Sequence, residues 1–171
     1  MRILLSVILF LFTAFQSANA GGIPDALTGM LSILKPKIQG KVIRVLDGDT
    51  IEVLQDKKSV RIRLENIDAP EKIQAFGRRS ANQLKALLAA QPVTVTYTQT
   101  DRYGRIIGHV FTTNGTDASR FMVQSGAAWV YERYNTDKSL PALQREAQEQ
   151  KRGLWADSNP VPPWEWRHKQ N

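Results

Sequence analysis

The alternation of apolar and polar side chains changes its period along the chain, and each period predicts a different element. From Lys41 the apolar residues recur at every second position, the pattern of strands with one buried face. An Asp-Gly pair at 47–48 and a Lys-Lys pair at 57–58 interrupt this alternation and indicate turns. The predicted elements are three consecutive strands over 41–46, 50–54 and 60–64.

The period lengthens to that of a helix after Pro70, which ends the strand pattern. Leu84 and Leu88 fall near one face of this helix. β-Branched residues then indicate two more strands, and the last two helical stretches are each followed by glycine near a C-cap position. The predicted elements are a helix over 74–90, strands over 93–97 and 105–112, and helices over 117–125 and 140–152.

This order of elements predicts the fold class. Three strands, a helix and two strands form a five-stranded OB-fold barrel with the helix between strands three and four. Two helices after the fifth strand make the class α+β. A chain of 171 residues suffices for one domain with its own core. We expect a lead-in with a short helix over 21–40, the barrel domain over 41–156, and a Pro- and Trp-rich tail over 157–171 whose segment 159–166 forms neither helix nor strand.

Residues 1–20 have the pattern of a secretory signal peptide. Arg2 precedes an apolar run over 3–15, and a small-x-small triplet ends at Ala20. The run is short for a bilayer span and no stop-transfer pattern follows it. We expect cleavage after Ala20, export to a periplasm or the medium, and no stable membrane association afterwards. An uncleaved membrane anchor is the alternative.

Composition narrows the chemistry. The chain has no cysteine, which excludes a thiol enzyme and disulfides, and its two histidines are too few to suggest a zinc site or histidine catalysis. The formal net charge is +7. A basic surplus suits a polyanionic partner, because lysine and arginine release counterions from phosphate backbones. Many exported proteins are basic without such a partner, so charge alone does not show that this protein binds a polyanion.

Two aspartates at strand ends are candidates for a metal site. Asp49 precedes the second predicted strand and Asp68 follows the third. Two carboxylates with a backbone carbonyl and waters suit a hard cation such as calcium. The alternative is a hairpin turn at Asp49 and a loop cap at Asp68. Asp47, in the same turn, is interpreted as turn chemistry or support for Asp49.

Three further residues have the types that phosphodiester hydrolysis needs. Glu71 follows a stiffening proline and could accept a proton from water, although acids are also common at helix starts. Arg63 and Arg105 could hold phosphoryl oxygens and stabilise developing charge. The alternative for a strand arginine is a solvated position, and this is our interpretation of Arg61.

Three segments in order resemble the signature segments of staphylococcal (thermonuclease-type) nucleases. Segment 47–50 reads Asp-Gly-Asp-Thr, segment 63–71 contains Arg-x4-Asp-x-Pro-Glu, and segment 101–105 reads Asp-x-Tyr-Gly-Arg. The Arg-Gly-Leu-Trp run at 152–155 also resembles the close of these domains. The resemblance extends over about 40–155, and three ordered segments are far more specific than one.

The resemblance implies an OB-type barrel with three helices. It also implies calcium-dependent cleavage of DNA and RNA that leaves 3′-phosphate ends. Ala69 stands where the family often has threonine, at a position expected to offer its backbone carbonyl. The implied site residues are Asp49, Asp68 and the Ala69 carbonyl for calcium, Glu71 for the attacking water, and Arg63 and Arg105 for the phosphate.

The resemblance also implies aromatic contacts to the nucleotide. Tyr103 matches an aromatic residue beside the nucleotide, and Arg102 replaces a lysine common before it. Tyr131 and Tyr134 are candidates for a tyrosine pair of the pocket, although their spacing departs from the family pattern. Such rings stack on any base.

Two other functions are alternatives to a nuclease that acts as a monomer. One is an OB-fold module that binds single strands without cutting them; the presence of the acidic and arginine positions argues for the enzyme. The other is an interaction protein of the cell envelope, suggested by the tail at 164–166, which is more typical of a strap packed on its own domain.

Overall fold

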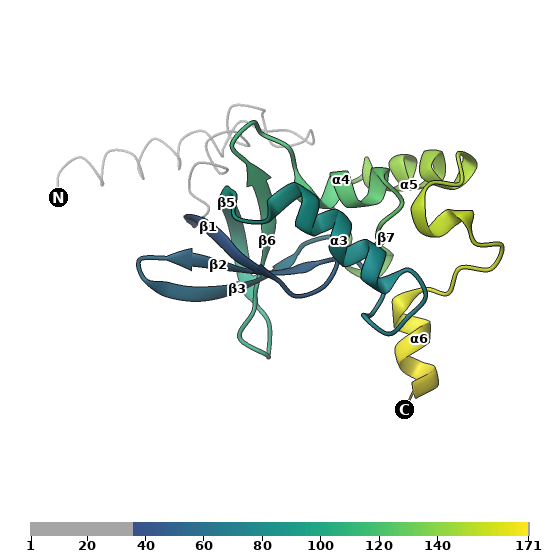
Figure 1. Ribbon diagram of the computed structural model, residues 1–171, viewed down its shortest axis with the longest axis horizontal. Helices are drawn as coiled ribbons and strands as arrows, with labels where there is room; N and C mark the ends of the chain where they lie inside the picture. Colours follow the sequence, from purple (N-terminus) through teal and green to yellow (C-terminus); the bar gives the residue numbers. More distant parts are fainter. Residues whose placement is uncertain (1–35, 171) are drawn as a thin grey trace, which may run out of the picture. The chain divides into compact units, whose positions relative to one another are not determined.

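Five strands close into a barrel in the computed structural model, which describes residues 36–170 (Figure 1). The strand order around the barrel is β1-β2-β3-β6-β5. β3 and β6 pair in parallel, and the other neighbours pair antiparallel. This confirms the predicted OB-type barrel. The strands are β1 (Lys37–Val45), β2 (Thr50–Gln55), β3 (Lys58–Leu64), β5 (Pro92–Thr100) and β6 (Ile106–Thr112).

Helices and two very short strands surround the barrel. β4 and β7 form a separate antiparallel pair, and α3 lies between the third and fourth barrel strands along the chain, as predicted. The remaining elements are β4 (Ile67–Asp68), α3 (Gly77–Leu88), α4 (Ala118–Gln124), β7 (Trp129–Val130), the 3-10 turns η2 (Glu132–Tyr134) and η3 (Gly153–Ala156), α5 (Leu140–Glu149) and α6 (Pro163–Gln170).

The C-terminal helix α6 corrects the expectation that segment 159–166 forms neither helix nor strand. Proline is well tolerated at the first position of a helix, where its missing N–H has no intrahelical partner and its φ is already helical. Pro163 occupies that position, and the seven residues after it contain no proline. The described part of the chain therefore has a fourth helix beyond the three predicted.

β1 differs from its prediction in two ways. It begins at Lys37, four residues before the expected start at Lys41. Its pairing with β2 also shifts register between Val42 and Arg44, so strict alternation ends there and Ile43 is 48% exposed. A bulge of this kind adds a residue to one strand and changes which face the following side chains take.

The core fills the barrel and the space under α3 and α4. Each large aliphatic side chain buried here stabilises the fold by about 1.5–3 kcal/mol. A smaller cluster joins η3 and α5 to β7, where the rings of Trp155 and Trp129 meet edge to face at 4.3 Å. The largest fully buried core residues include Ile51, Ile62, Leu64, Ile67, Leu84, Leu88, Met122 and Leu140.

The proposed signal peptide and most of the lead-in lie outside the described residues. Within the described part, no helix has both the length and the apolar character needed to cross a membrane.

Candidate functional site

The ends of β2, β3 and β4 bring three of the predicted site residues together. Thr50 lies opposite Arg63 in the β2–β3 ladder, which places Asp49 beside that arginine. Arg63 Nε lies 3.3 Å from Asp49 Oδ1, and Arg63 Nη2 donates to Asp68 Oδ1 at 3.0 Å. The side chains of Asp49 and Asp68 are only 8% and 4% exposed. One guanidinium thus joins two buried carboxylates.

Asp49 is held on both carboxylate oxygens. Its Oδ2 accepts a 2.7 Å hydrogen bond from the backbone amide of Ala69, and its Oδ1 accepts one of 2.9 Å from Thr50 Oγ1. Ala69 was expected to offer its carbonyl to a cation; the contact seen here is made by its amide instead, and the carbonyl role stays a prediction.

The turn before β2 has no spare room. A Cβ added at Gly48 would lie 1.9 Å from Ser80 Oγ on α3 and 2.7 Å from the Cβ of Ala69. Glycine at this position therefore lets the turn contact α3 directly. Asp47 Oδ1 accepts the amide of Asp49 at 3.0 Å, which is the supporting turn role expected for it. Burial and the neighbouring charge of Asp49 raise the pKa of Asp47 to about 7.

The guanidinium of Arg63 is also anchored to the main chain. Its Nη1 donates at 2.8 Å to the carbonyls of both Leu64 and Ile67. Its side chain is 13% exposed. Buried charges persist only when they are paired and hydrogen-bonded, and Arg63 meets both conditions. Arg63 therefore stabilises the fold in addition to contributing to the site.

Arg167 of α6 completes this cluster, and no sequence motif indicated it. Its Nη2 donates to Asp68 Oδ2 at 2.7 Å, and its Nη1 donates to Glu71 Oε1 at 2.9 Å. Burial raises the pKa of Asp68, while Arg167 and Arg63 oppose that rise. Burial disfavours the Arg167 cation, but its bonds to Asp68 and Glu71 outweigh burial and raise its pKa.

Glu71 is positioned through its backbone by the loop that leads into α3. Its amide donates to Gln74 Oε1 at 3.1 Å, and its carbonyl accepts from the amide of Gln74 at 2.8 Å. A Cβ added at Gly77 would lie 1.8 Å from this carbonyl, so α3 begins in direct contact with it. The Glu71 side chain is 41% exposed and is held by Arg167.

Arg105 lies on the same outer face of the barrel as Arg63 but has different partners. Arg63 is paired with Ile107 across the β3–β6 ladder, and Arg105 lies two residues before Ile107. Its Nε donates to Asp101 Oδ2 at 2.7 Å, and its guanidinium lies 5.5 Å from the Tyr103 ring centroid. The register therefore places Arg105 on the outer face that carries Arg63, while its ion pair and ring contact are with residues of its own turn.

The four nucleotide candidates form two separate pairs. Arg102 donates to the hydroxyl of Tyr103 at 2.7 Å, and Tyr103 is 68% exposed at the tip of the turn. Tyr131 and Tyr134 meet edge to face at 4.9 Å. Tyr131 also stacks on Trp164 of α6, with a centroid distance of 5.5 Å and planes 6° apart. The tail therefore contacts one of the predicted nucleotide rings.

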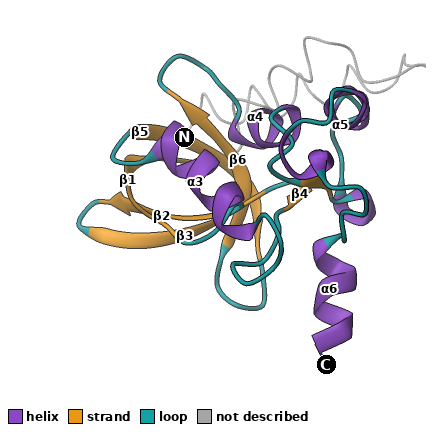
Figure 2. Cartoon of the chain, turned by 45° about the vertical axis from the view of Figure 1, so that its right-hand side comes forward, coloured by secondary structure: helices purple, strands orange, loops and turns teal. Residues whose placement is uncertain are grey.

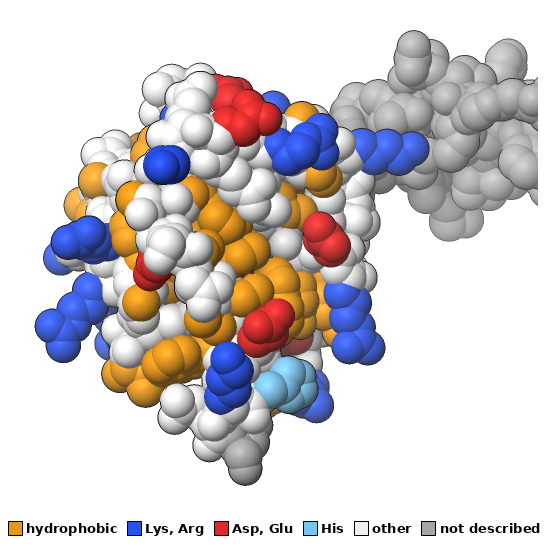
Figure 3. Space-filling model, turned by 90° about the vertical axis from the view of Figure 1, so that its right-hand side faces the viewer, with side chains coloured by type: hydrophobic (Ala, Val, Ile, Leu, Met, Phe, Trp, Pro, Cys, Tyr) orange, Lys and Arg blue, Asp and Glu red, His pale blue; other side chains and the backbone are white. Residues whose placement is uncertain are grey.

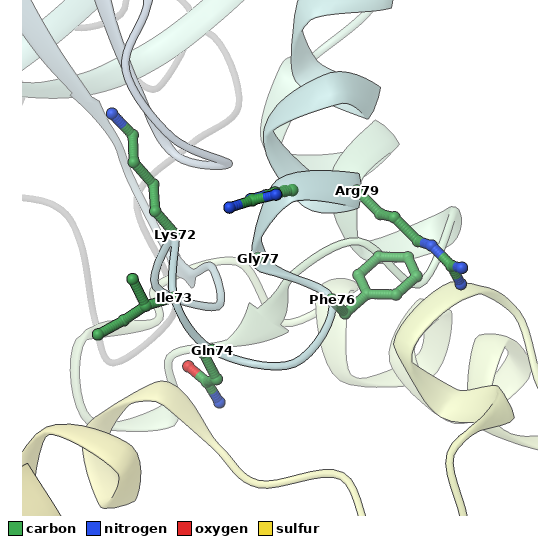
Figure 4. A pocket seen from close by; sticks show the side chains of 7 residues that line it. Lys72, Ile73, Gln74, Phe76, Gly77 and Arg79 are labelled. Carbon is green, nitrogen blue, oxygen red and sulfur yellow. The ribbon is translucent and has the colours of Figure 1, made fainter.

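A basic hollow of about 490 Å³ lies next to Glu71 (Figure 4). It is formed by the loop after Glu71 and the first turn of α3, and Ile73 on its rim is 80% exposed. Three basic residues line this hollow, with Lys72 and Arg79 pointing to opposite sides of it (Figure 4), and basic residues suit a phosphate backbone. The lining residues are Lys72, Ile73, Gln74, Phe76, Gly77, Arg78 and Arg79.

The donor set fits a hard cation. The guanidinium of Arg167 already lies between Asp68 and Glu71 as a bound cation. In the described residues, no group of three or more His, Asp or Glu side chains forms a metal cluster. A cation would thus be held by Asp49 and Asp68, with other oxygens from main chain, water or substrate. Calcium takes its oxygen ligands from carboxylates, main-chain carbonyls and waters together.

Comparison with known proteins gives consistent matches. The family model for staphylococcal nuclease homologues matches residues 61–157. An uncharacterized endonuclease of Escherichia coli is 61% identical over 137 residues, covering 80% of this chain and 90% of that protein. A micrococcal nuclease of Shigella flexneri is 44% identical over 139 residues, covering 75% and 80%. An uncharacterized endonuclease of Haemophilus influenzae is 34% identical over 170 residues, covering 99% and 86%.

Proposed function

Because this chain belongs to the staphylococcal nuclease family and is a nuclease with nucleic acid substrates, we propose that it is an exported, calcium-dependent endonuclease. It cleaves DNA and RNA and leaves 3′-phosphate ends. The observation that supports this most is the cluster of Asp49, Arg63, Asp68 and Glu71, because it combines cation-binding, phosphate-binding and proton-accepting groups.

The acidic residues provide the metal-binding site. The family is metal-dependent, and we assign calcium to the carboxylates of Asp49 and Asp68 with the carbonyl of Ala69. Oxygen ligands of this type suit calcium. When bound, the cation supplies positive charge beside the scissile phosphate and acidifies water next to it.

Glu71 and the arginines carry the remaining chemistry. Glu71 accepts a proton from the water that attacks phosphorus, and the bond from phosphorus to the 5′ oxygen breaks. The phosphate remains on the 3′ side, and the 5′ oxygen leaves as a hydroxyl after it takes up a proton. Arg63 and Arg105 stabilise negative charge on the equatorial and leaving oxygens.

Substrate contacts extend on both sides of this centre. Tyr103, Tyr131 and Tyr134 offer stacking surfaces, and Arg102 adds a charge beside Tyr103. The basic hollow after Glu71 holds the phosphate backbone of the flanking nucleotides (Figure 4). Contacts to phosphates and base faces carry little sequence information, so we expect low sequence specificity.

The protein acts as a monomer outside the cytoplasm. Cleavage of the signal peptide over 1–20 releases it to a periplasm or the medium, without stable membrane association. The absence of cysteine means that its fold needs no oxidative step after export.

A digestion series tests the proposed function. Single- and double-stranded DNA and RNA are each incubated with calcium, magnesium or chelator, and the product ends are analysed. We expect cleavage with calcium, none with chelator, recovery when calcium is restored, and 3′-phosphate ends. Full activity with magnesium alone, or 5′-phosphate ends, would contradict the assignment.

A further inference from the structure

The C-terminal strap, residues 157–170, crosses the face of the molecule that carries the candidate site. It leaves η3, runs through three prolines and ends in α6, a separate short helix beyond the barrel (Figure 2). Gln74 Nε2 donates to the carbonyl of Val161 at 2.6 Å, which ties the strap to the loop that positions Glu71. The strap is thus attached to the site before α6 begins.

Arg167 occupies the acidic end of the site. Its Nη2 bonds Asp68 Oδ2 at 2.7 Å, and its Nη1 lies 3.4 Å from Asp68 Oδ1 and 2.9 Å from Glu71 Oε1. Both oxygens of Asp68 are therefore engaged by the guanidinium. Arg63 already holds Asp68 Oδ1, so a calcium ion on Asp68 would need Oδ2, which Arg167 occupies, and two cations at one oxygen repel each other. Arg167 and the proposed cation therefore compete for the carboxylate of Asp68.

Trp164 occupies the aromatic end of the site. Its ring lies parallel to Tyr131, 6° apart at 5.5 Å between centroids, and meets Trp129 edge to face at 5.7 Å. Parallel stacking on an aromatic ring is how proteins hold a nucleic acid base. One turn of α6 thus presents both an aromatic plane to Tyr131 and a cation to Asp68, where a nucleotide and its metal would lie.

The contacts of α6 are suited to exchange. The helix has only eight residues, a length that is marginal in water without outside contacts. The side chain of Arg167 is 41% exposed, against 4% for Asp68. The face that carries α6 shows apolar side chains gathered centrally, with charged side chains of both signs among and around them (Figure 3). Apolar and ionic contacts of this kind can be replaced by a ligand with the same features.

We propose that α6 is an internal occupant of the active site, which leaves when a divalent cation and a nucleic acid strand take the positions of Arg167 and Trp164. This inference rests on the proposed function, because it assigns calcium to Asp68 and a base to Tyr131. Ligands that bind only the open form shift the population toward it, and their apparent affinity falls by the fraction of open form. The strap therefore weakens calcium binding until substrate is present.

Calcium affinity in the absence of substrate gives the first test. Arg167→Gln removes the competing cation, and Lys169→Gln removes one charge from the exposed side of the same helix as the matched control. Calorimetric titration with calcium should give a dissociation constant about tenfold lower for Arg167→Gln. This factor is expected if Arg167 occupies Asp68 in about nine-tenths of the unaltered molecules. Lys169→Gln should match the unaltered protein. Equal affinities in all three proteins, or weaker binding by Arg167→Gln, would overturn the inference.

Hydrogen exchange gives the second test and detects the movement itself. Amide exchange over 161–170 is compared without ligand, with calcium, and with calcium plus a phosphorothioate oligodeoxythymidylate. We expect exchange in α6 to become at least tenfold faster with both ligands, while β3 is unchanged. Slower exchange in α6 would mean that Arg167 is a permanent phosphate contact and would sink the idea.

The two tests separate this inference from the proposed function. If the protein cleaves DNA with calcium but the amides of α6 stay protected, the proposed function holds and the inference about the strap is wrong. If neither the unaltered protein nor Arg167→Gln binds calcium or cleaves nucleic acid, the proposed function is wrong. The inference, which rests on it, is then wrong as well.

Discussion

Nη2 of Arg167 donates a 2.7 Å hydrogen bond to Oδ2 of Asp68, although 99 positions separate the two residues. Asp68 also accepts a bond of 3.0 Å from Arg63 on its other oxygen. The carboxylate therefore lies between two guanidinium groups of different character. Arg63 is 13% exposed and bonded to two main-chain carbonyls, whereas Arg167 is 41% exposed at the end of the chain. We expect Arg63 to be a permanent part of the site and Arg167 an exchangeable one.

Arg63→Ala should cost both stability and activity. The substitution leaves two buried carboxylates, Asp49 and Asp68, without the cation that joins them, and breaking a buried pair costs about 3 kcal/mol. Urea unfolding in chelator measures the free energy of unfolding. Arg61→Ala is the control, because its exposed pair with Glu52 should contribute less than about 1 kcal/mol. Equal losses in the two variants would contradict a buried role for Arg63.

Arg105→Ala should lower activity with little change in stability. Its partners Asp101 and Tyr103 belong to its own turn, so the barrel does not depend on them. Loss of an arginine that stabilises a phosphoryl transition state costs on the order of 10³-fold or more in turnover. The measurements are kcat/KM on DNA with calcium and the urea midpoint. Arg44→Ala, another strand arginine with an acidic partner, should retain full activity. Near-full activity of Arg105→Ala would rule out its assigned role.

Gly48→Ala should weaken calcium binding by displacing the turn that carries Asp49. The added methyl group would meet Ser80 Oγ at 1.9 Å, and overpacking of this kind costs about 1–3 kcal/mol. Gly115→Ala is a control of similar cost, because its φ of 84° disfavours alanine by about 1–2 kcal/mol while the space around it is open. Thermal unfolding should show comparable losses. Calcium affinity should fall only in Gly48→Ala, and a parallel fall in both variants would contradict this local explanation.

Asp47 gives a pH dependence to the stability of the metal-free protein. Burial and the charge of Asp49 raise its pKa from 3.8 to about 7, so the folded state holds a proton that the unfolded chain has lost. The contribution of Asp47 to the free energy of unfolding therefore falls as pH rises between these values. Asp47→Asn keeps the oxygen that accepts the amide of Asp49 and removes the charge.

In chelator, Asp47→Asn should be more stable than the unaltered protein by up to about 4 kcal/mol at pH 8, and by much less at pH 4. Urea unfolding at several pH values measures the difference. Asp56→Asn, at an exposed turn position, should show no such trend. A gain that is the same at pH 4 and pH 8 would show that the charge of Asp47 is not its cause.

Much of the fold could be predicted because its signals are local. The barrel strands alternate apolar and polar residues between turn-forming pairs, and the observed α3 (Gly77–Leu88) and α5 (Leu140–Glu149) fall inside the predicted helices over 74–90 and 140–152. β4 and β7 were not predicted because two residues carry no period. α6 was not predicted because three prolines near its start obscure a helix that only begins at Pro163.

The sequence by itself determined the order of the barrel elements and the types of side chain at the site, because adjacent residues encode both the period and the signature segments. It supplied Asp49, Arg63, Asp68 and Glu71 as candidates without their geometry. Only the tertiary structure decided which guanidinium holds which oxygen, and that Arg167 and Trp164 lie on the site. The reason is physical: a contact across 99 positions depends on the path of the whole chain between them, and no neighbouring residue records that path.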